Sequence, residues 1–184
     1  KLYNKNILVT GGGGSIGSAL CIEILKHNPK KLFILDSSEI SLYNINNKLE
    51  KIYKNKIKII LGDCNDLIFL NNCFADITLD EIYHAAAYKH VNLGENNIYS
   101  MIKNNIFGTK NIIELAVNKK IKDFIFISSD KAVNPKSILG HSKKFGEYLV
   151  AHYFLKKIKS QKINFTIVRF GNVIASSGSV LPLF

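Results

Sequence analysis

Glycines at positions 11, 14 and 17 follow an apolar run and precede a helical pattern, a spacing suited to dinucleotide binding. Gly11 lets the chain turn sharply off a strand, and Gly14 lets the backbone approach a pyrophosphate without an intervening Cβ. Gly17 lets the helix pack closely on the sheet. The helix then begins near Ser15 and Ile16, where unpaired N–H groups and a partial positive charge favour phosphate. The loop therefore predicts a cofactor site; a glycine-rich loop without a ligand is the alternative.

An acidic residue, Asp36, ends the second apolar run, 19 residues beyond Gly17. An acid at this place accepts hydrogen bonds from the adenosine ribose and repels a 2′-phosphate. Residues 37–39 (Ser-Ser-Glu) include no arginine to offset that repulsion. The sequence therefore predicts NAD rather than NADP. An exposed aspartate that caps the next helix is the alternative, and it is compatible with the same role.

Further cofactor contacts are expected where the third and fourth apolar runs end. Asp63, followed by Cys64, is placed to accept a hydrogen bond from the adenine amino group; an aspartate that only forms a turn is the alternative. The small side chains of Ala85, Ala86 and Ala87 would let the backbone lie against the dinucleotide. Alanines are common in buried segments, so this run carries weight only together with the glycine loop.

The elements that must position these residues alternate regularly along the chain. Short runs rich in Ile, Val and Phe predict strands at Asn6–Thr10, Lys31–Asp36, Ile57–Leu61, Glu81–Ala85, Asp123–Ser128 and Phe165–Arg169. Helical patterns lie between them at Ile16–Lys26, Glu39–Tyr53, Leu67–Phe74, Asn97–Asn118 and Ser142–Lys159. Such alternation predicts an α/β fold: a Rossmann-type doubly wound parallel sheet of about six strands with helices on both faces. Every strand then ends at one edge, where such sheets bind ligands.

Composition narrows the class of protein. With 184 residues, 47% of them hydrophobic and 21% charged, the chain is typical of one globular domain. No apolar run reaches the roughly 18 residues that a membrane span needs, so we expect no membrane contact from this segment. The formal charge of +11 invites a nucleic-acid partner. Its lysines, however, alternate with apolar residues, as in 48–54 and 156–159, which indicates solvated helix faces and no nucleic-acid site.

Three cysteines, Cys21, Cys64 and Cys73, have no metal-ligand spacing and cannot all pair with one another. We expect reduced, mostly buried thiols, as in a cytoplasmic compartment, and no metal site. The chain starts just before the first expected strand and stops within an apolar stretch. We therefore expect residues 1–184 to be an NAD-binding Rossmann domain excised from a longer protein.

The motifs, in this order, resemble those of the extended short-chain dehydrogenase/reductase superfamily. More narrowly, the chain is similar to the bacterial UDP-N-acetylglucosamine 4,6-dehydratases of polysaccharide and protein-glycan synthesis, and the similarity spans essentially all residues. The most specific matching segments are Ala86-Ala87-Tyr88-Lys89-His90-Val91 and Ser129-Asp130-Lys131-Ala132. Further matches are Leu35-Asp36-Ser37-Ser38-Glu39, Asn105-Ile106-Phe107-Gly108-Thr109 and Arg169-Phe170-Gly171-Asn172-Val173.

This resemblance implies an internal redox cycle on a UDP-linked N-acetylhexosamine, with NAD as cofactor. Carbon 4 of the sugar is oxidised, water is lost across carbons 5 and 6, and the hydride returns to carbon 6. The expected partner is therefore a UDP-sugar, and family members often self-associate, so a homo-oligomer is a further expectation. The expected location is cytoplasmic. If the parent protein is like the membrane-linked members of the family, it would be anchored to the inner membrane with this domain facing the cytoplasm.

The resemblance also implies roles for residues after the fifth strand. Asp130 would protonate the leaving oxygen and Lys131 would remove the carbon-5 proton, each with a pKa moved toward neutrality. Ser129 would hydrogen-bond the hydroxyl on carbon 4. The alternatives are an Asp–Lys pair in a surface loop and a serine that ends the strand or caps a helix.

The sequence departs from the superfamily at one position. Most members carry Tyr-x-x-x-Lys on the next helix, whereas this chain has Leu139-Gly140-His141-Ser142-Lys143. Lys143 is in place to bind the nicotinamide ribose, but Leu139 can neither donate nor accept a proton. Ser129, a water or Asp130 are the candidates for taking the 4-OH proton. His141 is disfavoured, because at i+2 it points away from the face that carries Lys143.

Four further residues complete the expected site by resemblance. Lys89 and His90 would face the sugar or the cofactor, although a partly exposed loop pair is an equal alternative. Asn105 would fix the backbone near the site, and Asn172 would approach the nicotinamide or the substrate.

Three functions fit these observations. The first is a sugar-nucleotide 4,6-dehydratase, and the second is a 4-epimerase, which shares the oxidation at carbon 4 without losing water. The Asp130–Lys131 pair favours the dehydratase, because epimerases of the superfamily usually lack it. The third is a dinucleotide-binding module with little catalysis, which Leu139 favours. We expect the isolated chain to bind NAD yet to turn over poorly, because the substrate-binding region of the family would be absent.

Overall fold

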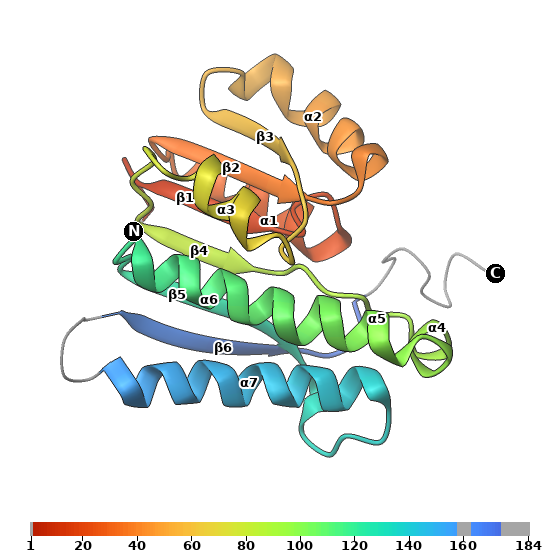
Figure 1. Ribbon diagram of the computed structural model, residues 1–184. Helices are drawn as coiled ribbons and strands as arrows, with labels where there is room; N and C mark the ends of the chain where they lie inside the picture. Colours follow the sequence, from red (N-terminus) through yellow and green to blue (C-terminus); the bar gives the residue numbers. More distant parts are fainter. Residues whose placement is uncertain (1, 158–162, 174–184) are drawn as a thin grey trace.

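A six-stranded parallel sheet organises the computed structural model, which describes residues 2–157 and 163–173 (Figure 1). Its strands lie in the order β3-β2-β1-β4-β5-β6, and each neighbouring pair is parallel. Their bounds are β1 Asn6–Thr10, β2 Lys31–Asp36, β3 Ile57–Leu61, β4 Glu81–His84, β5 Asp123–Ser129 and β6 Asn164–Phe170. This order is that of the doubly wound dinucleotide-binding sheet, so the predicted fold is confirmed.

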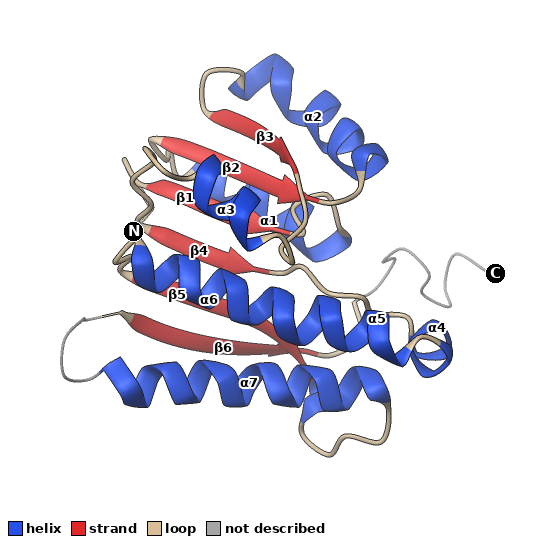
Figure 2. Cartoon of the chain, viewed as in Figure 1, coloured by secondary structure: helices blue, strands red, loops and turns tan. Residues whose placement is uncertain are grey.

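Helices cover both faces of the sheet (Figure 2). They are α1 Ser15–Lys26, α2 Glu39–Tyr53, α3 Leu67–Cys73, α4 Val91–Asn96, α5 Ile98–Ile102, the π-helical turn η1 Lys103–Phe107, α6 Gly108–Asn118, the 3₁₀ turn η2 Asp130–Ala132, and α7 Ile138–Lys157. Helices α1 and α2 pack on one face of the sheet, while α3, α6 and α7 pack on the other. Within the described part of the chain, no helix is long and apolar enough to cross a membrane.

Alternation of side chains along buried strands builds the two halves of the core. Ile7 and Val9 of β1 belong to the cluster with α1 and α2, whereas Leu8 between them belongs to the cluster with α3 and α6. All three side chains are fully buried. Both faces of the central strands are therefore covered, which explains why these strands are apolar without interruption.

Parallel pairing brings the ends of the strands to one edge. Thr10 pairs in register with both Leu35 and His84, and Ser129 pairs with Phe170. The strand order reverses between β1 and β4, which is where sheets of this kind open a crevice for ligands. The glycine loop, the segment after β4 and the Asp130–Lys131 pair all leave the sheet at this edge.

The structure differs from the sequence prediction in local detail. The single helix expected at Asn97–Asn118 contains the π-helical turn η1, and the turns α4 and η2 were not expected. Strand β4 ends one residue early at His84, although the Ala85 amide still donates to the Thr10 carbonyl at 3.1 Å. Helix α7 begins at Ile138 rather than Ser142, because the Ser137 hydroxyl accepts from the Gly140 amide; the end expected at Lys159 lies outside the described residues.

A fully buried histidine ties three elements together beneath the crevice. His84 Nε2 lies 2.9 Å from Thr109 Oγ1, which itself donates to the Asn105 carbonyl at 2.6 Å. Nε2 must therefore donate, so Nδ1 accepts from the Thr10 hydroxyl at 2.6 Å. Burial lowers the pKa of His84 to about 3, and the charge of Lys143 adds to this shift, which keeps the imidazole neutral. This chain of hydrogen bonds fixes the ends of β1 and β4 against the start of α6.

We expect His84 to make the fold acid-sensitive. Its pKa is lower in the folded state than the ordinary value of 6.5, so its contribution is complete above pH 6.5 and is lost as the pH falls toward 3. The slope from this group is about 1.4 kcal/mol per pH unit. Urea unfolding at several pH values should show a shallower acid loss in His84→Gln than in wild type, whereas His152→Gln, an exposed control, should keep the wild-type slope. Equal slopes for all three proteins would contradict this account.

Candidate functional site

The glycine loop leaves a cradle that side chains would fill. Gly11 has a φ of +65°, and a Cβ there would lie 2.6 Å from the Ala86 amide nitrogen. A Cβ on Gly17 would collide with the Gly11 carbonyl oxygen. A Cβ on Gly14 would lie 3.2 Å from the same oxygen, toward the open crevice. Two of the three glycines are thus required by the fold itself, and Gly14 keeps the entrance to α1 accessible to a ligand.

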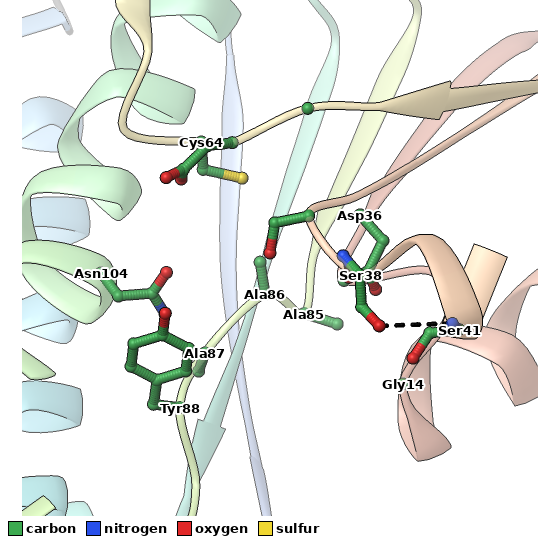
Figure 3. Close-up of a pocket in the computed structure, with 14 residues that line it drawn as sticks. Gly14, Asp36, Ser38, Ser41, Cys64, Ala85, Ala86, Ala87, Tyr88 and Asn104 are labelled. Atoms are coloured by element: carbon green, nitrogen blue, oxygen red, sulfur yellow. Dashed lines mark hydrogen bonds between the residues drawn. The ribbon is translucent and has the colours of Figure 1, made fainter. Parts of the chain in front are cut away.

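A cavity of about 240 Å³ lies beside this loop (Figure 3). Cys64 and Asn104 border it on one side, Asp36 and Ser38 on the other, and Ala86 lies between them. Of the predicted cofactor residues, it is lined by Gly11, Gly14, Asp36, Asp63, Cys64, Ala85, Ala86 and Ala87. The carboxylate at the end of β2, the small side chains after β4 and the third-strand segment therefore meet, as expected for an adenosine site.

Asp36 holds the loop rather than the following helix. Its Oδ2 accepts from the Gly13 amide and its Oδ1 from the Ser38 amide, both at 3.0 Å. The cap of α2 is Ser38, whose hydroxyl accepts from the Ser41 amide. The alternative of a helix-capping Asp36 is therefore wrong.

The contacts of Asp63 and Cys64 are less specific to a cofactor site than those of Asp36. Asp63 accepts from the backbone and side-chain amides of Asn65, the turn-forming arrangement, although it also borders the cavity. Burial raises the pKa of the Cys64 thiol to about 12, so it is a neutral wall of the cavity. Cys21 is buried as well and Cys73 is partly buried, and all three thiols are free.

A larger groove of about 1070 Å³ continues from this cavity along the sheet edge. Both share Gly11, Gly14 and Tyr88 in their walls. The groove brings together most of the remaining predicted residues: Ser15, Ile16, Gly17, Lys89, His90, Ser129, Lys131, Lys143 and Asn172. A long ligand can therefore extend from Asp36 to the end of β5.

Ser129, Asp130 and Lys131 form one hydrogen-bonded group at the end of β5. The Ser129 hydroxyl donates to Asp130 Oδ1 at 3.0 Å, and Lys131 Nζ donates to the same oxygen at 3.3 Å. Lys131 Nζ also donates to Asn172 Oδ1 at 3.3 Å, which links the pair to the segment after β6. Ser129 accepts from the Lys131 amide too, so it caps η2 as the alternative interpretation proposed.

The environment of Asp130 shifts its pKa in the direction opposite to that expected of an acid. Hydrogen bonds from Ser129 and then Lys131 lower the pKa of this carboxyl group, which is exposed to solvent and is not among the residues of the groove wall. Asp130 is therefore ionised before a substrate covers it. An acid role requires that it first receive a proton or lose solvent.

Lys143 is buried beneath the groove. Its Nζ donates to the Ile127 carbonyl at 2.8 Å and lies 4.9 Å from the centre of the Phe126 ring. Burial lowers the pKa of Lys143 to about 8, while the charge of Glu147 opposes the shift. Lys143 is among the residues that line the groove.

Leu139 and His141 lie where their helical spacing from Lys143 predicts. Leu139 is 5% exposed and lines the groove one turn before Lys143. His141 is exposed and is not among the residues of the groove wall. An apolar side chain therefore occupies the place of the superfamily's tyrosine, and no histidine substitutes for it.

Asn105 clamps the segment after β4. Its Oδ1 accepts from the Tyr88 amide at 2.8 Å, and its Nδ2 donates to the Tyr88 carbonyl and to Ser142 Oγ, both at 3.0 Å. Asn105 lies within η1, so the π-helical turn aims its amide at this segment. Sequence reasoning placed Asn105 here by resemblance, but it missed Tyr88, Asn104 and Ser142. No local pattern distinguishes Asn105, because Lys103 and Asn104 directly before it are polar as well.

These features fit a dinucleotide. The cradle is one that Cβ atoms would fill, Asp36 stands at the end of β2, and Lys143 faces the groove. No group of three or more His, Cys, Asp or Glu side chains within residues 2–157 and 163–173 is arranged to hold a metal ion.

Comparison with known proteins agrees with the resemblance seen in the sequence. A family model described as "Polysaccharide biosynthesis protein" matches residues 7–184. The chain is 41% identical over its whole length to "Capsular polysaccharide biosynthesis protein CapD" of Staphylococcus aureus, of which it covers 31%. It is 35% identical to "UDP-N-acetylglucosamine 4,6-dehydratase (inverting)" of Campylobacter jejuni and 33% identical to "UDP-glucose 4-epimerase" of Rickettsia bellii; each match uses 98% of the chain and 52% of the relative.

A solved structure is similar to the chain over nearly its whole length. The X-ray structure of Pen from Bacillus thuringiensis superposes with a TM-score of 0.93 at 33% identity, over 99% of this chain and 56% of that one. The chain thus spans about half or less of the length of these relatives.

Proposed function

Because the chain belongs to the polysaccharide biosynthesis protein family, we propose that it is the NAD-binding part of a sugar-nucleotide 4,6-dehydratase. The proposed substrate is a UDP-N-acetylhexosamine. The observation that carries the proposal is the hydrogen-bonded group Ser129–Asp130–Lys131, of which Ser129 and Lys131 line one groove with the glycine cradle. Dehydration needs an acid and a base side by side, and this group supplies both.

The proposed cofactor contacts follow the groove. The amides at the start of α1 would bind the pyrophosphate, Asp36 the adenosine ribose, and Lys143 the nicotinamide ribose. When bound there, the cofactor would supply the oxidation at carbon 4 of the sugar and the hydride that returns to carbon 6. Since it is regenerated in each cycle, tight binding costs nothing in turnover.

Asp130 and Ser129 offer a route for the proton that Leu139 cannot take. In the proposal, Ser129 passes the 4-OH proton to the Asp130 carboxylate, to which it already donates a hydrogen bond. The lowered pKa of Asp130 then has a purpose, because the carboxylate must be ionised to receive that proton. Once Asp130 carries that proton, Lys131 acts as the free amine and removes the carbon-5 proton, while Asp130 returns its own proton to the hydroxyl on carbon 6, which leaves as water. A proton from Lys131 or solvent is added to carbon 5 when the hydride returns to carbon 6.

A 4-epimerase is the second candidate, since several relatives bear that name. It would share the cofactor site and the oxidation at carbon 4, but it would have no use for an acid–base pair at carbons 5 and 6. The Asp130–Lys131 contact therefore favours the dehydratase. A binding module with little catalysis is the third candidate, and Leu139 is the residue that favours it.

The substrate test separates these candidates by product. The whole protein is incubated with NAD and UDP-N-acetylglucosamine, and the sugar nucleotide is analysed by mass. A dehydratase yields a 4-keto-6-deoxy product lighter by one water, an epimerase yields an isomer of unchanged mass, and a binding module yields no product. Either of the last two results would overturn the proposal.

Asp36→Ala should weaken NAD binding and reduce the preference over NADP. The carboxylate would no longer accept from the ribose or from the Gly13 amide, and hydrogen bonds to a charged group contribute about 1.5–3 kcal/mol. We expect a loss in NAD affinity of roughly 10- to 100-fold by calorimetric titration, with a smaller loss for NADP. Asp66→Asn, which alters the exposed cap of α3, is the control and should bind both cofactors as wild type does. Unchanged affinity in Asp36→Ala would place the ribose elsewhere.

A further inference from the structure

Glu147 is a buried carboxylate to which the proposed chemistry assigns no role. Only 5% of the residue is exposed, and both of its oxygens have partners. Oε1 accepts from Ser128 Oγ at 2.7 Å and from Arg169 Nε at 2.8 Å, while Oε2 accepts from Arg169 Nη2 at 2.7 Å. A buried charge is tolerated when it is paired in this way, and the two-pronged contact with arginine fixes its orientation.

The partners of Glu147 come from the strands that carry the proposed catalytic group. Ser128 directly precedes Ser129 on β5, and Arg169 is its partner in register on β6, three residues before Asn172. Glu147 itself lies one turn after Lys143 on α7. One side chain therefore joins the three chain segments that place Ser129, Asp130, Lys131, Lys143 and Asn172 at the groove.

We propose that Glu147 is a positioning residue: it fixes the ends of β5 and β6 against α7 and places a negative charge one helical turn from Lys143. The first part rests on the proposed function, since it concerns the alignment of Asp130 and Lys131. A second contact supports it, because Lys143 Nζ donates to the Ile127 carbonyl, one residue before Ser128. Helix α7 is thus attached to two consecutive residues at the end of β5.

The charged groups around Lys143 show why the charge of Glu147 matters to it. From β4 it faces His84, which is neutral; from η2, Lys131 lines the same groove and is paired with Asp130. On α7 and β6, Lys144 and Arg169 are positive and pair with Glu147. Burial favours the neutral amine of Lys143, and Glu147 is the carboxylate whose charge opposes this. Replacing Glu147 with a neutral residue should therefore lower the pKa of Lys143.

The test compares Glu147→Gln, Glu147→Asp and the control Glu114→Gln. Glu114 also joins two helices, accepting from Tyr153 of α7 and pairing with Lys110, and both of these partners lie on helices rather than at the ends of β5 or β6. The pKa of Lys143 is measured by NMR with ¹³C-labelled lysine, assigned with a Lys143→Met variant, and NAD affinity is measured against pH. Turnover and KM for the UDP-sugar are measured in the whole protein, below the melting temperature of each variant.

In Glu147→Gln we expect the Lys143 pKa and the alkaline limit of NAD binding to fall by roughly one pH unit. We expect turnover to fall by about 100-fold, with little change in KM, because the acid–base pair is displaced. Glu147→Asp should restore the pH limit, since it keeps the charge, but not full turnover. Glu114→Gln should match wild type in every respect except melting temperature.

A Glu147→Gln variant with the wild-type Lys143 pKa and NAD–pH profile would overturn the proposed charge role. Wild-type turnover in this variant would overturn the positioning role. The lysine titration needs no turnover, so it still decides the charge role if wild type fails to dehydrate a UDP-sugar. That failure alone would count against the proposed function.

Discussion

Lys131→Met abolishes dehydration while NAD binding stays within about twofold of wild type; this is the expected result that separates chemistry from cofactor binding. Lys131 has no predicted contact with the dinucleotide, but it donates to Asp130 and Asn172 at the end of the groove. Loss of a general base typically costs 10²- to 10⁴-fold in rate. Methionine keeps the length of the side chain, so the groove wall remains filled. Turnover is followed by product mass, and NAD affinity by calorimetry.

The control for this variant is Lys136→Met, an exposed lysine in the loop before α7. It should show wild-type turnover, which excludes a general effect of lowering the positive charge. Asp130→Asn provides a second check, because it should lose dehydration to a similar extent and retain NAD. Dehydration at the wild-type rate in Lys131→Met would remove the assignment of the base.

Gly17→Ala should abolish NAD binding and destabilise the fold together. The added Cβ would collide with the Gly11 carbonyl oxygen, a backbone atom that cannot move without shifting the turn at φ +65°. Overpacking of this kind costs about 1–3 kcal/mol in unfolding free energy. The loop would move away from the position that receives the pyrophosphate, so we expect a loss in NAD affinity of at least about 100-fold.

Gly14→Ala is the matched comparison, since its Cβ would meet only the Gly11 oxygen at 3.2 Å. It should leave the urea midpoint near that of wild type while weakening NAD binding, because the methyl group faces the crevice. If both variants bind NAD normally, the cofactor does not use this loop. If only Gly14→Ala unfolds, the packing described for Gly17 is wrong.

The architecture could be predicted from sequence because its signals are local. Uninterrupted apolar runs such as Ile7–Val9 mark strands buried on both faces, and the following glycines mark the turn into α1. The π-helical turn around Asn105 could not be predicted, since it accompanies hydrogen bonds of that amide with Tyr88 and Ser142, which are distant in the chain. Tertiary hydrogen bonds decide such irregularities, and no pattern of neighbours encodes them.

The candidate site could be predicted in part for the same reason. Residues directly after strands, including Asp36 and Lys131, could be placed at the sheet edge by topology alone. Glu147 was missed because a glutamate in a helix with several lysines resembles any solvated residue; only the fold shows that Arg169 and Ser128 surround it. The shift in the Asp130 pKa likewise depends on hydrogen-bond geometry.

The most direct test of the proposed chemistry is solvent exchange at carbon 5 of the sugar. The whole protein is incubated with NAD and UDP-N-acetylglucosamine in D₂O, and the product is examined by proton NMR. If Lys131 removes the carbon-5 proton and solvent replaces it, the 4-keto-6-deoxy product carries deuterium at carbon 5, and Lys131→Met forms none. A product that keeps its original carbon-5 proton, or an epimer without exchange, would contradict the account.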